Sequence, residues 1–392
     1  MMEKVSNLEI TARIGKLQEL MRKQEIEGAL LLQRADLIYF SGTGQNAHLF
    51  VPAEGEPVLL VRKSLVRASE ESPLQTIVQL NSFKDLIQYL VDVKVLGMEL
   101  DVLPVNLFER YRALAPASKI VDVSGLIKQI RIVKSPFELA QLRQAAVTLN
   151  AAVESLPQIL RPGISEVALA GEMEAVARAG GSQGYIRMRS FNQEMNFAHI
   201  FSGPNAAYPS FFDGPTGGLG LGAAFPQGPS LDSIVPGTPI VMDICVGYNG
   251  YIVDQTRIAS LGPIDPFFRD VYAKSLKIQE FLINAARPGV VAGDLYEIAL
   301  QQVTEMGLRE HFMGYVPDQA PFVGHGVGLE LDELPVLAKG VKTVLEPGMV
   351  FAAEPKFIFP GKGVAGIENT FVVTETGLER ITFSTEEIIE VG

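Results

Sequence analysis

The sequence predicts a mixed α+β protein with two domains, and three observations lead to this prediction. Short apolar strands alternate with helical segments over residues 1–128, which is typical of a compact α/β domain. A pattern of helix, helix and hairpin then occurs twice over residues 136–392, which indicates an internal duplication. Each of those two hairpins carries a pair of acidic residues among apolar ones. We therefore expect domains at 1–128 and 136–392.

The N-terminal domain begins with an amphipathic helix. Apolar and charged residues recur at helical spacing over residues 8–27, and Gly28 marks the end of the pattern. Apolar stretches bounded by turn residues then predict strands in GALLLQ, DLIYFSG, PVLLVRK, PLQTIVQL, VKVLGMEL and SKIVDVS. No group of reactive side chains stands out in this domain, so we place the functional site in the second one.

Composition excludes several classes of protein. Of the 392 residues, 47% are hydrophobic and 20% are charged, an ordinary balance for a globular protein. The net charge of −12 argues against non-specific nucleic-acid binding. The sequence has no apolar run of the ~18 residues that suggests a membrane span, and MMEKVSNLEI lacks the pattern of a signal peptide. Since Cys245 is the single cysteine, we expect a cytoplasmic protein without disulfides.

The duplication in the second domain is marked by repeated helix ends. The capping box SPFE, with proline at the first helical position, begins a long helix that ends at RPG, residues 161–163. A second long helix ends at RPG, residues 287–289. Another helix and an acid-bearing hairpin follow each one, so we expect two halves related by a pseudo-twofold axis.

The first hairpin places two aspartates on one face. Asn249-Gly250 is a strong signal for a two-residue turn, because both positions tolerate positive φ. That turn pairs Cys245 with Asp254 and makes Asp243 a diagonal neighbour of Asp254 on the same face.

The second hairpin places two glutamates opposite each other. A loop centred on Gly361 pairs residues at equal distances from it, which sets Glu354 across from Glu368. Packing of the two hairpins would bring four carboxylates into one interior site. Because buried like charges repel, this arrangement predicts cations among the acids.

His325, in FVGHGVGLELDE, lies between glycines that allow close approach of the backbone. Four carboxylates and one imidazole suit two divalent ions about 3.5–4 Å apart, with a nucleophilic water between them. Oxygen-rich ligation favours manganese or cobalt, with iron or zinc as alternatives.

Several motifs together resemble the prolidase, Xaa-Pro aminopeptidase and creatinase superfamily: IRIVKSPFELAQLRQAA, RPGISE, SGPNAAYP, MDICVGYNGYIVDQTR, GHGVGLELDE, PGMVFAAEP and GIENT. The resemblance implies a pita-bread C-terminal domain, and DLIYFSGT is similar to the creatinase-type N-terminal domain. It also implies a homodimer, and Glu354 as the base that shuttles a proton. The implied dinuclear site consists of Asp243, Asp254, His325, Glu354 and Glu368.

The chain departs from that family at three positions. Prolidase-like members usually have histidine where this chain has Ser210, Pro321 and Asp332. An ionised aspartate can only accept hydrogen bonds, whereas histidine can donate them. These exchanges therefore change what the pocket can stabilise, and Asp332 becomes a candidate catalytic residue or a contact for a cationic group of the substrate.

Three further features have two interpretations each. His199 either replaces a lost pocket histidine or packs in the core, and Asp213 either caps a turn or binds a cationic group. The segment 214–228, GPTGGLGLGAAFPQG, is either a mobile lid or dimer arm or a surface insertion.

The leading hypothesis is a metal-dependent aminopeptidase or dipeptidase of the Xaa-Pro type, acting on a small peptide. The alternative is a lyase or C–N hydrolase on the same fold, acting on a small charged metabolite. A non-catalytic binding protein is disfavoured, because all five implied ligands are present and the chain is acidic. We expect neither a nucleic-acid partner nor a membrane.

Overall fold

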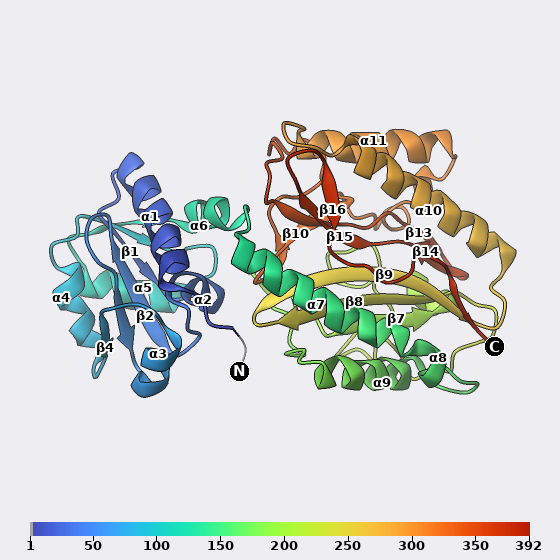
Figure 1. Ribbon diagram of the computed structural model, residues 1–392, viewed down its shortest axis with the longest axis horizontal. Helices are drawn as coiled ribbons and strands as arrows, with labels where there is room; N and C mark the ends of the chain where they lie inside the picture. The colour runs from blue at the N-terminus through green and yellow to red at the C-terminus, as the bar shows by residue number, and fades with distance from the viewer. Residues whose placement is uncertain (1–2) are drawn as a thin grey trace. The chain divides into compact units, whose positions relative to one another are not determined.

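The computed structural model describes residues 3–392 and divides into two compact units, with the division between Arg131 and Ile132. Figure 1 shows both units. Within the described residues, no helix combines the length and the apolar character that crossing a bilayer would require.

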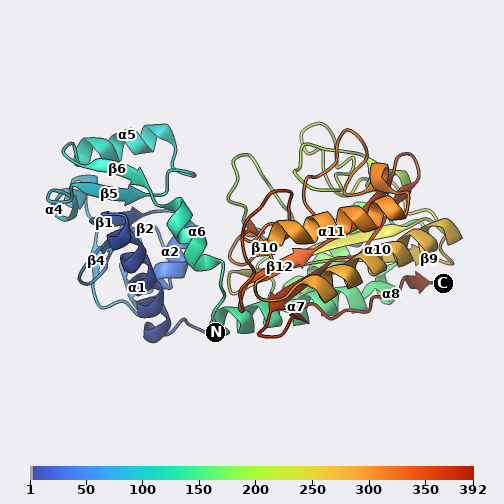
Figure 2. The same cartoon turned by 90° about the horizontal axis from the view of Figure 1, so that it is seen from above.

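The first unit is built on a six-stranded sheet in the order β4-β3-β2-β1-β5-β6. Its strands are β1 (Gly28–Leu31), β2 (Ala47–Pro52), β3 (Val58–Val61), β4 (Ile77–Gln79), β5 (Val95–Met98) and β6 (Lys119–Asp122). Its helices are α1 (Asn7–Lys23), α2 (Arg34–Ser41), α3 (Leu65–Glu71), η1 (Phe83–Leu86), α4 (Ile87–Leu90), α5 (Val105–Leu114) and α6 (Ser124–Arg131). Figure 2 shows α1 and α5 on opposite sides of the sheet.

The strand prediction for DLIYFSG is wrong, because this stretch lies in helix α2. The Gln33 side chain accepts the N–H of Asp36 at the start of the helix, and Gly42 ends it with a φ of 76°. A short apolar run does not distinguish a strand from a buried helix, and here the helix caps decide. In this unit, the strand that the sequence did not predict is β2.

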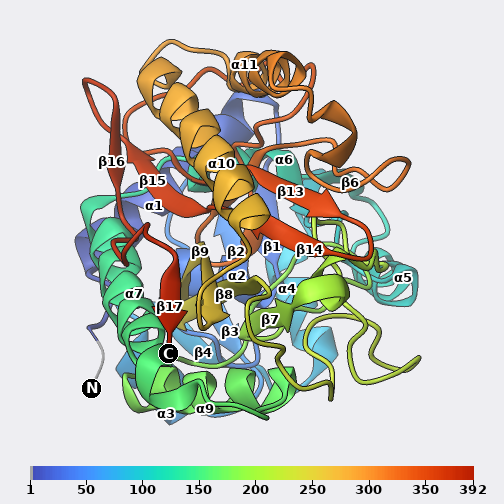
Figure 3. The same ribbon diagram turned by 90° about the vertical axis from the view of Figure 1, so that its right-hand side faces the viewer.

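The second unit contains two layers of helices around curved sheets. Its helices are α7 (Pro136–Glu154), α8 (Leu156–Ile159), α9 (Glu166–Ala179), η2 (Gly203–Ala207), α10 (Pro266–Ala285), α11 (Ala292–Glu305) and η3 (Arg309–His311). Figures 1 and 3 show the strands between α7 and α9 on one side and α10 and α11 on the other.

The strands of this unit form two larger sheets and one short ribbon. The sheets have the orders β17-β9-β8-β7 and β11-β10-β12-β15-β16, and β13 pairs with β14. Their bounds are β7 (Ala198–Ser202), β8 (Ile240–Tyr248), β9 (Tyr251–Leu261), β10 (Gly324–Val327), β11 (Leu331–Glu333), β12 (Val350–Ala353), β13 (Lys356–Phe359), β14 (Gly363–Gly366), β15 (Asn369–Val373), β16 (Leu378–Arg380) and β17 (Ile389–Val391). Two helices thus precede a long hairpin twice, which confirms the predicted fold class.

The first hairpin has the predicted register. Cys245 is opposite Asp254, and Asp243 is opposite Thr256. At the turn, Asn249 has a φ of 47° and Gly250 a φ of 92°, as the two-residue turn requires. The β8–β9 ladder is unbroken from Ile240 to Ala259.

The second hairpin also keeps its predicted register but is divided into two ladders. Residues at equal distances from Gly361 pair in the inner ladder, β13 with β14, and in the outer ladder, β12 with β15. Glu354 and Glu368 lie in the gap between the two ladders. Their side chains therefore enter the interior at a point where the hairpin has no regular strand pairing.

Candidate metal centre

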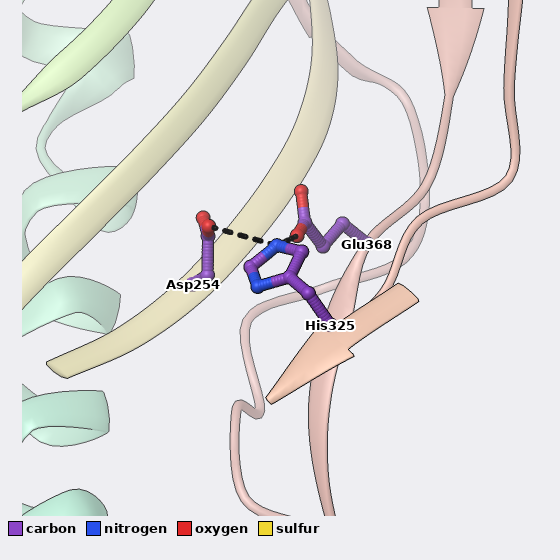
Figure 4. Close-up of side chains that lie close together, drawn as sticks. All are labelled: Asp254, His325 and Glu368. Atoms are coloured by element: carbon purple, nitrogen blue, oxygen red, sulfur yellow. Dashed lines mark ion pairs between the residues drawn. The ribbon is translucent and has the colours of Figure 1, made fainter. Parts of the chain in front are cut away.

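The structure brings the predicted acids and histidine into one buried cluster. Asp243 and Asp254 come from the first hairpin and Glu354 and Glu368 from the second, and each is at most 7% exposed. His325, on β10, is 6% exposed. Figure 4 shows its ring between Asp254 and Glu368.

His325 Nε2 faces three carboxylates. It lies 3.9 Å from Oδ2 of Asp254, 3.7 Å from Oε1 of Glu354 and 3.8 Å from Oε1 of Glu368. Ligands that bind one ion at about 2.0–2.2 Å lie within ~4.4 Å of one another. The ligand atoms of Asp254, His325 and Glu368 all lie within 4.8 Å of one another, which allows these three side chains to share a single ion, and Glu354 Oε1 lies on the same side of the histidine.

Two oxygen atoms in the cluster support this interpretation. Asp254 Oδ1 and Glu368 Oε1 are buried and have no hydrogen-bond partner among the described residues. A buried carboxylate oxygen without a partner is costly, and a bound cation would satisfy both atoms. The side chains present thus fit at least one divalent ion.

Lys356 is a member of the cluster that the sequence analysis missed. Its ammonium donates to Asp243 Oδ2 at 2.9 Å, Glu354 Oε2 at 2.8 Å and Glu368 Oε2 at 2.9 Å. Burial would lower the pKa of Lys356, but the surrounding carboxylates outweigh it and raise that pKa well above its ordinary value. The sequence signal was its position two residues after Glu354, which places both side chains on the same face of a strand.

Gly366 makes room for the stem of this lysine. It is directly opposite Lys356 in the inner ladder. A Cβ on Gly366 would lie 2.5 Å from Cγ of Lys356 and 2.7 Å from its Cα. Glycine is therefore required here by the close approach of the lysine rather than by a turn.

Burial and repulsion raise the pKa of two carboxyl groups in the cluster. Burial raises the pKa of Glu368 to about 7, with Lys356 acting against this rise and Glu354 and Asp243 adding to it. Burial, followed by repulsion from Glu368, raises the pKa of Asp254 well above its ordinary value. A divalent ion would remove the cause of both shifts by supplying positive charge.

Asp332 contacts His325 on the side away from the carboxylates. Asp332 Oδ1 lies 3.3 Å from His325 Nδ1, and the Asp332 side chain keeps 36% of its surface exposed. Burial lowers the pKa of His325, but nearby carboxylates, Asp332 most strongly, raise it on balance. This contact leaves Nε2 of His325 directed at the cluster, an arrangement that commonly orients a metal-binding histidine.

Other predicted pocket residues lie at different distances from the cluster. His199 is opposite Asp243 in the β7–β8 ladder, is 3% exposed and lines the same pocket as the acids. Asp213 lines that pocket too. Ser210 instead lines a neighbouring pocket of roughly 360 Å³, and residues 214–216 border both. Pro321 is exposed.

Comparisons with known proteins identify the family of the chain. The model of metallopeptidase family M24 matches residues 140–375, and that of the creatinase/prolidase N-terminal domain matches residues 13–133. The chain is 26% identical over 380 residues to the Xaa-Pro dipeptidase of Pyrococcus furiosus, covering 96% of this chain and 99% of that protein.

Solved structures give the same result over the whole length. The prolidase from Pyrococcus horikoshii OT3 superposes with a TM-score of 0.82 at 26% identity, covering 96% of this chain and 100% of that one. The Xaa-Pro dipeptidase from Bacillus anthracis superposes with a TM-score of 0.84 at 25% identity, covering 97% and 100%. The resemblance inferred from the motifs is thus confirmed, and the chain belongs to metallopeptidase family M24, with a creatinase/prolidase-type N-terminal domain.

Proposed function

We propose that this protein is a metal-dependent hydrolase that cleaves short peptides, as its relatives named Xaa-Pro dipeptidase do. The main support is the buried cluster of carboxylates around His325, in which oxygens of Asp254 and Glu368 have no hydrogen-bond partner among the described residues. Without a cation, the buried carboxylates repel one another and leave these oxygens unsatisfied; a bound divalent cation would relieve both costs.

The proposed metal ligands are Asp254, His325, Glu354 and Glu368, and a bound divalent ion would polarise the substrate carbonyl and acidify a water. Glu354 lines the pocket, and in this proposal its carboxylate is the group that carries a proton to the leaving nitrogen. Asp332 holds His325 in position through Nδ1. Phe212 and Phe322 line the same pocket and exclude bulk water.

The test is hydrolysis of a panel of dipeptides, with and without proline in the second position, by manganese- or cobalt-loaded protein. We expect turnover that a chelator removes and added metal restores. His325→Ala should abolish it, whereas His311→Ala, which changes a histidine in η3 outside the centre, should not. Absence of turnover on every peptide, with metal measured in the protein, would contradict the proposal.

A second candidate is a lyase or C–N hydrolase that acts on a small cationic metabolite. Asp213 and Asp332 both line the pocket, and their mutual repulsion contributes to a raised pKa of Asp332, after the larger effect of burial. Two acids at a pocket mouth attract a positively charged group. Turnover of a small cationic metabolite by the metal-loaded protein, without turnover of any dipeptide, would favour this candidate.

Manganese as the ion, a cytoplasmic location and a homodimer also belong to this proposal. The oxygen-rich ligand set supports manganese, and the single cysteine supports a reducing compartment. Elemental analysis of protein purified without added metal tests the first, and sedimentation velocity tests the dimer.

A further inference from the structure

The position of Lys356 bears on the number of ions that the cluster can hold. Its ammonium lies within 2.8–2.9 Å of one oxygen each from Asp243, Glu354 and Glu368. A divalent ion in that place would need the same three oxygens at about 2.0–2.2 Å. The ammonium and such an ion therefore exclude each other.

Other carboxylate oxygens of the cluster face His325 rather than Lys356. Oε1 of Glu354 and Oε1 of Glu368 face His325, while the Oε2 atoms of both residues face Lys356. Asp254 Oδ2 also lies on the His325 side. The two glutamates thus bridge two positions, as they would between two ions, but one position is already filled by the lysine.

The lysine is closely packed in this interior. Its side chain is 1% exposed, and its stem lies so near Gly366 that a Cβ there would come within 2.5 Å of Lys356 Cγ. If an ion displaced the ammonium, a buried positive charge would lose three charge-assisted hydrogen bonds at once. Removing such partners from a buried charge is strongly destabilising.

The balance of charge in the cluster also favours a single ion. The four carboxylates carry four negative charges, and one divalent ion together with the Lys356 ammonium supplies three positive ones. Two divalent ions and the ammonium would supply five positive charges and reverse the sign of the interior. The group formed by Asp254, His325 and Glu368 has ligand atoms within 4.8 Å of one another, which is sufficient for one ion.

We propose that the centre binds one divalent ion, through Asp254, His325, Glu354 and Glu368, and that the Lys356 ammonium takes the place of a second ion beside Asp243. The proposal rests on the metal-dependent function proposed above. It differs from the expectation of two ions that the family resemblance implies, and it makes Asp243 a partner of the lysine rather than a ligand. Lys356 is a positioning residue that holds Glu354 and Glu368 from the side opposite the ion.

The test is the metal content of the full-length protein after loading with manganese and removal of free metal. Elemental analysis gives the number of ions, electron paramagnetic resonance distinguishes an isolated manganese from a coupled pair, and anomalous scattering locates each ion. We expect one ion per chain in the native protein and two in Lys356→Gly, a doubling of the content. Lys362→Gly, the same change in the exposed turn of the same hairpin, should bind one.

Asp243→Asn provides a second measurement if Lys356→Gly does not fold. One ion should remain in this variant, because the proposed ligands are intact. Two ions in the native protein, or loss of the ion in Asp243→Asn, would overturn the proposal. If the native protein binds two ions and hydrolyses peptides with metal, the single-ion proposal is wrong and the proposed function is supported. If it binds one ion and hydrolyses no peptide, the proposed function is wrong and the single-ion centre is supported.

Discussion

The two hairpins that supply the acids differ in how they present them. In the first, the β8–β9 ladder is unbroken, and Asp243 and Asp254 project from regular strands. In the second, the pairing stops between Ala353 and Lys356, and Glu354 and Glu368 emerge in that gap. Each half contributes two carboxylates, but only the second half contributes a lysine.

This difference shows that the two halves share a backbone arrangement but carry different side chains at matching places. Asp243 and Glu354 each lie seven residues after a proline that precedes a glycine, so they occupy matching places in the repeat. Two residues later the first half has Cys245 and the second has Lys356, both buried. A neutral thiol in one half and an ammonium in the other make the centre electrostatically asymmetric.

The largest expected effect is the loss of activity when Glu354, and not its counterpart Asp243, is changed. Glu354→Gln should reduce kcat by about 10²–10⁴-fold, because it removes the proposed proton carrier. Asp243→Asn, at the matching place in the first hairpin, should cause a smaller loss, since Asp243 contacts Lys356 rather than the proposed ion. Steady-state kinetics of both variants measures the difference, and equal losses would show that the two halves act alike.

The next effect concerns the histidine, which neither hairpin supplies. Asp332→Gly removes the carboxylate beside Nδ1 of His325 without backbone strain, because Asp332 has a φ of 61°. Metal affinity should fall by roughly 10–100-fold, as for other residues that orient a ligand. Titration calorimetry measures it, with Asp213→Gly as a control that should bind metal normally. Equal metal affinity in the two variants would contradict the orienting role of Asp332.

A smaller effect is expected from the glycine that accommodates the lysine. Gly366→Ala should destabilise the protein by about 1–3 kcal/mol, because the new Cβ would overlap Lys356. Gly171→Ala, at an open position in α9, should instead stabilise it by up to ~1 kcal/mol. Chemical denaturation measures both changes, and an unaffected Gly366→Ala would show that the inner ladder adapts without cost.

The last expected effect is a pH dependence of the stability of the metal-free protein. The pKa of Glu368 rises to about 7 in the folded protein, from an ordinary value of 4.5. Between these values the folded state holds a proton that the unfolded state has lost, so stability should fall as pH rises from about 4.5 through about 7. Bound metal should flatten this slope. Thermal unfolding at several pH values, with and without manganese, measures it, and a metal-free slope of the opposite sign would contradict it.

The sequence by itself determined the registers of both hairpins and the family. Asn249-Gly250 fixed one turn, and equal spacing about Gly361 fixed the pairing of the other, because a ladder propagates the register that its turn sets. The motifs around His325 and the acids were sufficient for the family, which the comparisons confirm. Local helix caps overrode the strand prediction for DLIYFSG.

Only the tertiary structure showed that Lys356 joins the predicted acids. The sequence placed Lys356 and Glu354 on one face, but the partner of the lysine in the first hairpin, Asp243, is 113 residues away. Strand pairing is local and repeats every second residue, so it can be read from spacing. Whether Lys356 reaches an acid of the other hairpin depends on how the two halves pack. The spacing of residues along the chain does not give the distance between these side chains.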